Sequence, residues 1–103
     1  MKNIMDLQKM IKTAKEMQDK LQKETADMRV EGTSGGGMVT AVLDGRKNLL
    51  QLRLEAEVVN REEIEMLQDL IIAAFTDAAS KVDEALAEKL GGLGGHLKIP
   101  GLF

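Results

Sequence analysis

The side chains best suited to chemistry in this sequence are lysines near its start. Residues 1–29 hold seven of the 14 Lys and Arg residues against five Asp and Glu, a local net charge of +2. Residues 61–90 hold three basic residues against eight acidic ones, a local net charge of −5, and the whole chain carries −3. Because ammonium groups attract phosphates and carboxylates repel them, a polyanion would approach the first segment and avoid the second.

The residues that most often perform catalysis are scarce. The chain has no cysteine, which excludes disulfides, thiolate catalysis and cysteine zinc sites. Its one histidine, His96, has no second histidine with which to share a metal, and a triad of Ser34 with His96 would rest on residue type alone. We therefore expect no enzyme, no cofactor, no metal site and no small-molecule substrate.

Two glycine-rich segments, residues 33–37 and 91–95, invite comparison with phosphate-binding loops. Such loops lead from a strand into a helix, and the Walker type also needs a Gly-Lys-Ser/Thr sequence. Here the first segment leads into another strand pattern, and the second follows a helix pattern without a charged partner. We interpret both as structural turns.

The element that must position the lysines is a long N-terminal helix. Asn3 is a plausible helix start, and no Gly or Pro interrupts the chain from there until Gly32. Apolar side chains recur at alternating steps of three and four residues, with Gln18 and Thr25 at weaker positions: Ile4, Leu7, Ile11, Ala14, Leu21 and Met28. This spacing fits either a coiled-coil-like seam between two copies or an ordinary amphipathic helix that packs on its own subunit.

Most lysines of this helix lie away from the apolar seam. They are Lys2, Lys9, Lys12, Lys20 and Lys23, while Lys15 flanks the seam. Outward lysines often serve only as a solvated face. Two copies in a symmetric dimer could instead offer paired arms that follow the phosphates of a duplex, without base-specific contacts.

The middle of the chain predicts three short strands. They are residues 29–34, 38–43 and 49–57, joined by a glycine turn at 35–37 and a hairpin turn at 44–48 that contains Asp-Gly. In the last strand Leu50, Leu52, Leu54 and Ala56 alternate with polar residues. We therefore expect one buried face and one polar face.

A second helix closes the predicted fold. Asn60 with Glu63 forms a capping-box pattern, and the apolar stripe that follows is wide enough to suggest two buried sides. We expect the glycines of 91–95 to end this helix and a flexible tail to occupy about 91–103. The 103 residues fit a single domain, 1–103, and the aromatic content of 2% implies a thin core that association would reinforce.

The chain shows no signal for export or membrane insertion. The charged N-terminus lacks the apolar stretch of a signal peptide, and no run approaches the ~20 apolar residues of a spanning helix. We expect a cytoplasmic protein without a membrane partner.

Three runs of the sequence are distinctive. They are GGGMVTAVLDG at 35–45, EMLQDLIIAAFTDA at 65–78 and LKIPGLF at 97–103. The chain resembles the YbaB/EbfC family of bacterial nucleoid-associated proteins in these runs and over its whole length. Two positions depart from the common family pattern, Gln68 where Glu is frequent and Thr76 where Asn is frequent.

The resemblance implies an α+β subunit of the α-β-β-β-α type and a tweezers-like homodimer joined largely through its sheets. It also implies binding of double-stranded DNA with a change in duplex conformation, within the nucleoid, and possible roles in nucleoid organisation and gene regulation. By location on the helical arms, the DNA contacts would be Lys2, Lys9, Lys12, Lys20 and Lys23. The alternative is an adaptor that binds another protein through apolar helix faces and does not bind DNA.

Overall fold

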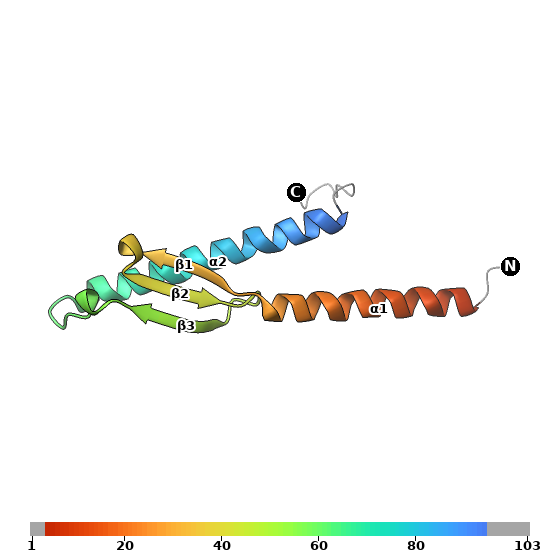
Figure 1. The fold of residues 1–103 in the computed structure, drawn as a ribbon, viewed down its shortest axis with the longest axis horizontal. Coiled ribbons are helices and arrows are strands. Elements are labelled where there is room, and N and C mark those ends of the chain that lie inside the picture. Colours follow the sequence, from red (N-terminus) through yellow and green to blue (C-terminus); the bar gives the residue numbers. More distant parts are fainter. Residues whose placement is uncertain (1–3, 95–103) are drawn as a thin grey trace.

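The computed structural model describes the backbone of residues 4–94 and the side chains of residues 6–91. The elements follow one another as α-β-β-β-α (Figure 1). They are α1 (Ile4–Asp27), β1 (Val30–Ser34), β2 (Val39–Leu43), β3 (Leu49–Leu54) and α2 (Ile64–Gly94). The α+β class and the order of elements expected from the sequence are confirmed.

The three strands form an antiparallel sheet in the order β1-β2-β3. The glycine turn between β1 and β2 is a single 3-10 turn in which Gly35, Gly36 and Gly37 all have positive φ, a conformation that favours glycine. Between β2 and β3 the register shifts near Val42. The sheet is short, so its stability depends on what covers its faces.

Helix α2 packs against one face of the sheet, over β1 and β2. The core lies between them, where aliphatic side chains interdigitate: Val39, Ala41, Leu43, Ala74, Ala78 and Val82, joined by Val58. Among the described residues, the core contains no aromatic ring, which agrees with the thin core expected from composition. One stripe of α2 is buried rather than the two sides expected, because the sheet covers the helix from one direction only.

Helix α1 projects away from this body. The molecule measures 75 × 26 × 17 Å, with a radius of gyration of 20.0 Å, whereas a compact domain of this length would have about 13 Å. Every described side chain from Asp6 to Lys20 is exposed. The seam of α1 therefore does not pack on the sheet of its own subunit.

Two boundaries differ from the sequence prediction. Strand β3 ends at Leu54, not at residue 57, because a 3-10 turn, Ala56–Val58, brings Val58 into the core. Helix α2 begins at Ile64 rather than at Asn60, whose side-chain Oδ1 accepts the backbone N–H of Glu62 at 3.0 Å and so stabilises a preceding turn.

The end of α2 also differs from the prediction. The helix continues through Gly94, so residues 91–94 are helical and not part of a tail. Gly91 is exposed with nothing near it, and glycine can extend a helix at a cost of about 1 kcal/mol relative to alanine. Lys2, His96 and the tail expected beyond Gly94 lie outside the described residues.

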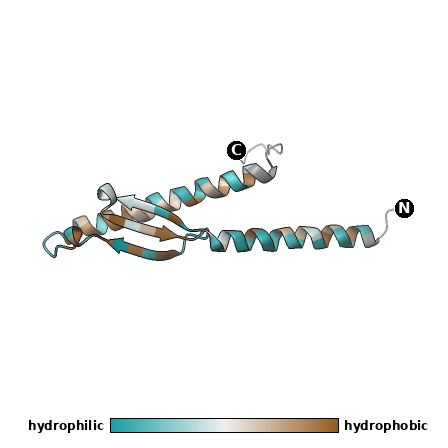
Figure 2. Cartoon of the chain, viewed as in Figure 1, coloured by the Kyte–Doolittle hydropathy of each residue, from teal (hydrophilic) through white to brown (hydrophobic). Residues whose placement is uncertain are grey.

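The apolar face of β3 is the third difference. Leu50, Leu52 and Leu54 are 45%, 37% and 38% exposed, whereas the sequence predicted a buried face. Figure 2 shows hydrophobic residues on β3 as well as on β2, although α2 crosses only β1 and β2. The face is apolar as expected, but the single chain leaves it uncovered.

Candidate nucleic-acid interface

The candidate lysines in the described part of α1 all have exposed side chains. Lys9, Lys12, Lys20 and Lys23 are exposed, and none of the four lies within ion-pairing distance of a described carboxylate. The acidic residues Glu16, Asp19 and Asp27 are interleaved with them along the helix. The positive charges therefore remain available to a ligand despite their acidic neighbours.

The four lysines form two rows. Lys9 and Lys20 are separated by eleven residues, and so are Lys12 and Lys23. Eleven residues make almost exactly three turns, so each pair lies along one line of the helix with about 16 Å between its members. The two rows lie about 60° apart around the axis. A rigid helix thus holds four ammonium groups over one broad face.

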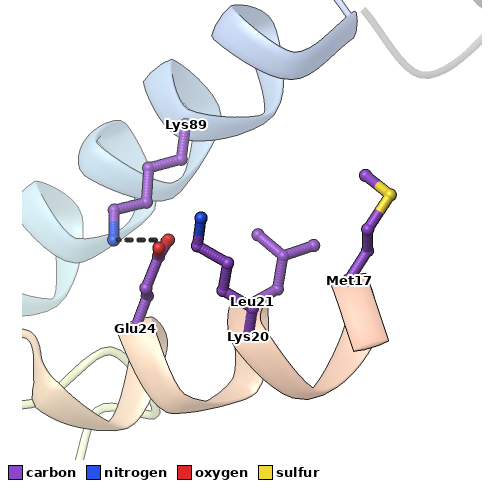
Figure 3. A pocket seen from close by; sticks show the side chains of 5 residues that line it. All are labelled: Met17, Lys20, Leu21, Glu24 and Lys89. Carbon is purple, nitrogen blue, oxygen red and sulfur yellow. Dashed lines mark ion pairs between the residues drawn. The ribbon is translucent and has the colours of Figure 1, made fainter. Parts of the chain in front are cut away.

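Lys20 lies beside a groove between α1 and the last turns of α2. Figure 3 shows Lys20 beside this shallow pocket of about 220 Å³. Its other lining residues are Met17, Leu21, Glu24 and Lys89. The Nζ of Lys89 lies 3.9 Å from a carboxylate oxygen of Glu24, and this ion pair links the two helices.

Lys89 is a basic residue near the candidate face that sequence analysis did not select. It belongs to the strongly acidic segment 61–90, and local charge alone gave no reason to separate it from its neighbours. Its position follows from the path of α2, which returns alongside the end of α1 (Figure 1). Only the tertiary arrangement brings it next to Lys20.

The apolar seam of α1 is exposed over its first half. Leu7, Met10, Ile11 and Met17 are 53–68% exposed, and a shallow depression beside them is lined by Met10, Met17 and their neighbours. Among the described side chains of α1, half-buried ones occur only in the last turns, as at Leu21. Most of the seam is therefore uncovered in the single chain.

A second apolar surface lies where α2 passes the uncovered side of β3. The backbone N–H of Thr33 in β1 donates to Asp77 of α2 at 2.9 Å, while Asp83 pairs at 2.9 Å with Lys47 in the turn that leads into β3. Ile72 precedes Asp83 by eleven residues, so it lies on the same side of α2, the side toward β3.

We refer to this region as the β3 surface, defined as Leu50, Leu52, Leu54, Ile72 and Phe75. The leucines share the core face of the sheet, since Leu52 and Leu54 lie opposite Ala41 and Val39. Ile72 is 63% exposed and Phe75 37%. Exposed apolar groups concentrated in one region are typical of a surface that another protein covers.

The described residues offer no alternative chemical site. Among them, no three His, Cys, Asp or Glu side chains are placed to hold a metal ion. No helix within the described range is both long and apolar enough to cross a membrane. Basic charge on α1 and the exposed apolar surfaces are therefore the features from which a function must be argued.

A solved structure shares this fold. The crystal structure of an uncharacterized protein from Helicobacter pylori superimposes with a TM-score of 0.72 and covers 90% of this chain and 98% of that one. The two sequences are 22% identical, so the likeness concerns the arrangement of helices and strands.

Sequence relatives are closer. A nucleoid-associated protein of Geobacillus sp. (strain WCH70) is 51% identical over 78% of this chain and 74% of its own length. A nucleoid-associated protein of Caldanaerobacter subterraneus is 43% identical over 95% of this chain and 91% of its own. One of Dictyoglomus thermophilum is 39% identical over 100% of both chains.

The family model named "YbaB/EbfC DNA-binding family" matches residues 1–97. Its description concerns DNA binding and not a catalysed reaction, which agrees with the expectation that the chain is not an enzyme. The resemblance noted in the sequence is thus confirmed over almost the whole chain, and the chain belongs to the YbaB/EbfC DNA-binding family.

Proposed function

We propose that this protein binds duplex DNA in the bacterial nucleoid through the lysines of α1. The observation that carries the proposal is the set of four exposed, unpaired lysines on a helix that stands clear of an acidic body. Phosphate contacts by lysine supply affinity without reading the base sequence. Lys2 belongs to the same set by sequence position.

The acidic character of the rest of the chain supports this choice of surface. Residues 61–90 carry a net charge of −5, most of it on α2. Duplex DNA would be repelled from that helix and attracted to α1. Helix α1 holds five lysines against five acidic residues, and Lys2 and Arg29 at its ends bring residues 1–29 to +2. A negative molecule with its outward lysines on this arm therefore binds a polyanion in a restricted orientation.

We further propose that the functional unit is a homodimer. The β3 surface offers exposed apolar side chains, and β3 is an edge strand with a free row of backbone groups. A symmetric contact between two such surfaces would bury both and thicken a core that is thin in one chain. The dimer carries two α1 arms, and an arm pair of fixed spacing can bend or clamp a duplex.

The relatives are named nucleoid-associated proteins, which supports a role in nucleoid organisation and gene regulation. The alternative function, an adaptor that does not bind DNA, is not supported, because the family to which the chain belongs is a DNA-binding one. The exposed Met-rich seam of α1 still provides a surface for protein contact beside DNA binding.

The proposal is tested by replacing Lys9, Lys12, Lys20 and Lys23 together with Gln. The exposed side chains make no ion pair within the described chain, so the fold and unfolding midpoint should persist. Duplex affinity should fall by at least about tenfold at low salt, because phosphate contacts dominate such binding. Unchanged affinity in the folded variant would refute the assignment.

The control for net charge is Arg61→Gln. Arg61 is exposed and belongs to the turn before α2, and this turn lies at the opposite end of the molecule from α1 (Figure 1). If α1 makes the contacts, this change should lower affinity by less than about twofold. A per-charge loss as large as that of the lysine variant would show that overall charge, and not α1, governs binding.

A further inference from the structure

The direction of α1 is set at its C-terminal end. The first four turns of described side chains are exposed, and half-buried residues begin only at Leu21. A helix held at one end behaves as a lever, and 24 residues give it a length of about 36 Å. Whatever holds the last turn therefore decides where the lysines lie.

The turn between β2 and β3, residues 44–48, holds the last helical turn of α1 in place. The backbone N–H of Gly45 donates to the carbonyl oxygen of Thr25 at 3.0 Å, and the N–H of Met28 donates to the same oxygen at 3.3 Å. The carbonyl groups at the end of a helix have no partner within the helix. Gly45 thus supplies a partner from a different element and fixes α1 to the sheet.

Gly45 permits this contact because it has no side chain. A Cβ at this position would lie 2.4 Å from the carbonyl oxygen of Thr25 and 2.6 Å from its Cγ2. The φ of Gly45 is outside the left-handed region, so conformational freedom is not the reason for glycine here. The close approach of the two backbones is the reason.

Asp44 makes the turn rigid. Its carboxylate accepts the backbone N–H groups of Arg46 and Asn48, both at 2.9 Å, and the side-chain amide of Asn48 at 3.0 Å. The residue is only 7% exposed. These hydrogen bonds, first of all the one from the Asn48 side chain, lower the pKa of Asp44 and keep its carboxylate charged.

The turn is in addition connected to α2. Lys47, which adopts a left-handed φ of 65°, places its Nζ 2.9 Å from Asp83 of that helix. A direct ion pair between α1 and α2, Glu24 with Lys89 at 3.9 Å, joins two partly exposed side chains (Figure 3). Exposed pairs of this kind contribute little, the Lys47 and Asp83 pair included, so the backbone hydrogen bond from Gly45 to Thr25 makes the turn the main support of α1.

We propose that the turn at residues 44–48 is a positioning element that fixes the direction of α1, with Gly45 as its point of contact. The effect of this turn on DNA binding rests on the proposed role of the α1 lysines. A tilt of about 10° at Thr25 would move Lys9, about 24 Å away along the helix, by about 4 Å. This shift is large enough to take lysines out of register with phosphates.

The test measures the direction of α1 without using DNA. Because the chain has no cysteine, Gln8→Cys and Ser80→Cys introduce two exposed sites for spin labels, one on each helix. Labelled chain is diluted with an excess of unlabelled chain, so that the measured distance lies within one subunit. Gly45→Ala should shift this distance by several ångströms or broaden its distribution.

The matched control is Gly91→Ala, where a Cβ would meet no atom within 4 Å. It should leave the distance unchanged. If Gly45→Ala does not fold, Asn48→Ala removes the hydrogen bonds of that side chain without a steric clash, and it should broaden the distribution. A folded Gly45→Ala with the wild-type distance, or an unfolded one together with an unchanged Asn48→Ala, would overturn the proposal.

Duplex binding by the same variants separates the two proposals. We expect Gly45→Ala to bind duplex DNA about three- to tenfold more weakly than the wild type. Its cooperative unfolding transition should show that the sheet is still folded. A changed distance with unchanged DNA affinity would support the positioning role and count against the α1 lysines as the contacts. An unchanged distance would overturn the positioning role whatever the DNA affinity.

Discussion

Gly32 of β1 lies directly beneath the backbone of Ala78 in α2, so closely that a Cβ on Gly32 would sit 2.1 Å from the Ala78 nitrogen. Helix α2 therefore packs on the sheet at a distance that only glycine allows. Ala74 and Ala78, both fully buried, complete this contact from the helix side.

Gly32→Ala should destabilise the protein strongly. The overlap is with backbone atoms that cannot rotate away, so the helix must move and the core must open. We expect the free energy of unfolding to fall by about 3 kcal/mol or more, measured by urea denaturation. Gly91→Ala is the control and should be neutral or slightly stabilising, and equal midpoints for the two variants would contradict the packing described.

Asp77 should contribute to stability in a pH-dependent manner. The hydrogen bond from the Thr33 N–H, and secondly the interaction with Lys81, lower the pKa of Asp77 below its ordinary value of 3.8. A carboxyl with a lower pKa in the folded state stabilises the fold above pH 3.8, and this contribution is lost as the pH falls through the folded-state pKa. Asp77→Asn should therefore be less stable at pH 7 and lose less stability between about pH 4 and pH 2.

The control for Asp77 is Asp69→Asn. Asp69 is exposed on the same helix and makes no hydrogen bond or ion pair within the described chain. Its variant should show the wild-type dependence of unfolding on pH. If both variants reduce the loss of stability between about pH 4 and pH 2 equally, the interaction of Asp77 with Thr33 is not the cause of that loss.

Leu52→Glu should prevent dimer formation. Leu52 lies within the β3 surface and is 37% exposed in the single chain, so a carboxylate there costs little in a monomer but would be buried in the proposed dimer. Sedimentation equilibrium should give the mass of one chain. Gln51→Glu places the same charge on the opposite, polar face of β3 and should remain dimeric.

The exposed acids of α2 should weaken DNA binding. Glu84→Gln with Glu88→Gln removes two negative charges from the helix that runs beside the end of α1. We expect duplex affinity to rise by about two- to fivefold at low salt, and the gain to shrink as salt screens it. Glu57→Gln with Glu62→Gln, at the far end of the molecule, should have a smaller effect.

The sequence predicted the elements well because their signals are local. The uninterrupted periodicity up to residue 28, the Asp44-Gly45 turn and the alternation in β3 each determine structure within a few residues. The predicted ends of elements were wrong where contacts between distant parts of the chain determine the structure. Val58 enters the core and ends β3 early, while Asn60 caps a turn in place of a helix.

The site was harder to predict than the fold. Lysine spacing indicated the outward face of α1, but the proximity of Lys89 to Lys20 depends on the return path of α2. The need for glycine at Gly32 and Gly45 could not be read from the sequence, because it arises from the approach of backbones far apart in the chain. Both positions instead resembled ordinary turn or strand glycines.

The most direct test of the account is the salt dependence of duplex binding, measured for the wild-type chain and for the variant with Lys9, Lys12, Lys20 and Lys23 replaced by Gln. If the dimer neutralises about four phosphates, wild-type affinity should fall by about two orders of magnitude between 50 and 200 mM salt. The variant should show a much shallower dependence. Equal slopes for the two proteins would contradict the claim that the arm formed by α1 holds the DNA.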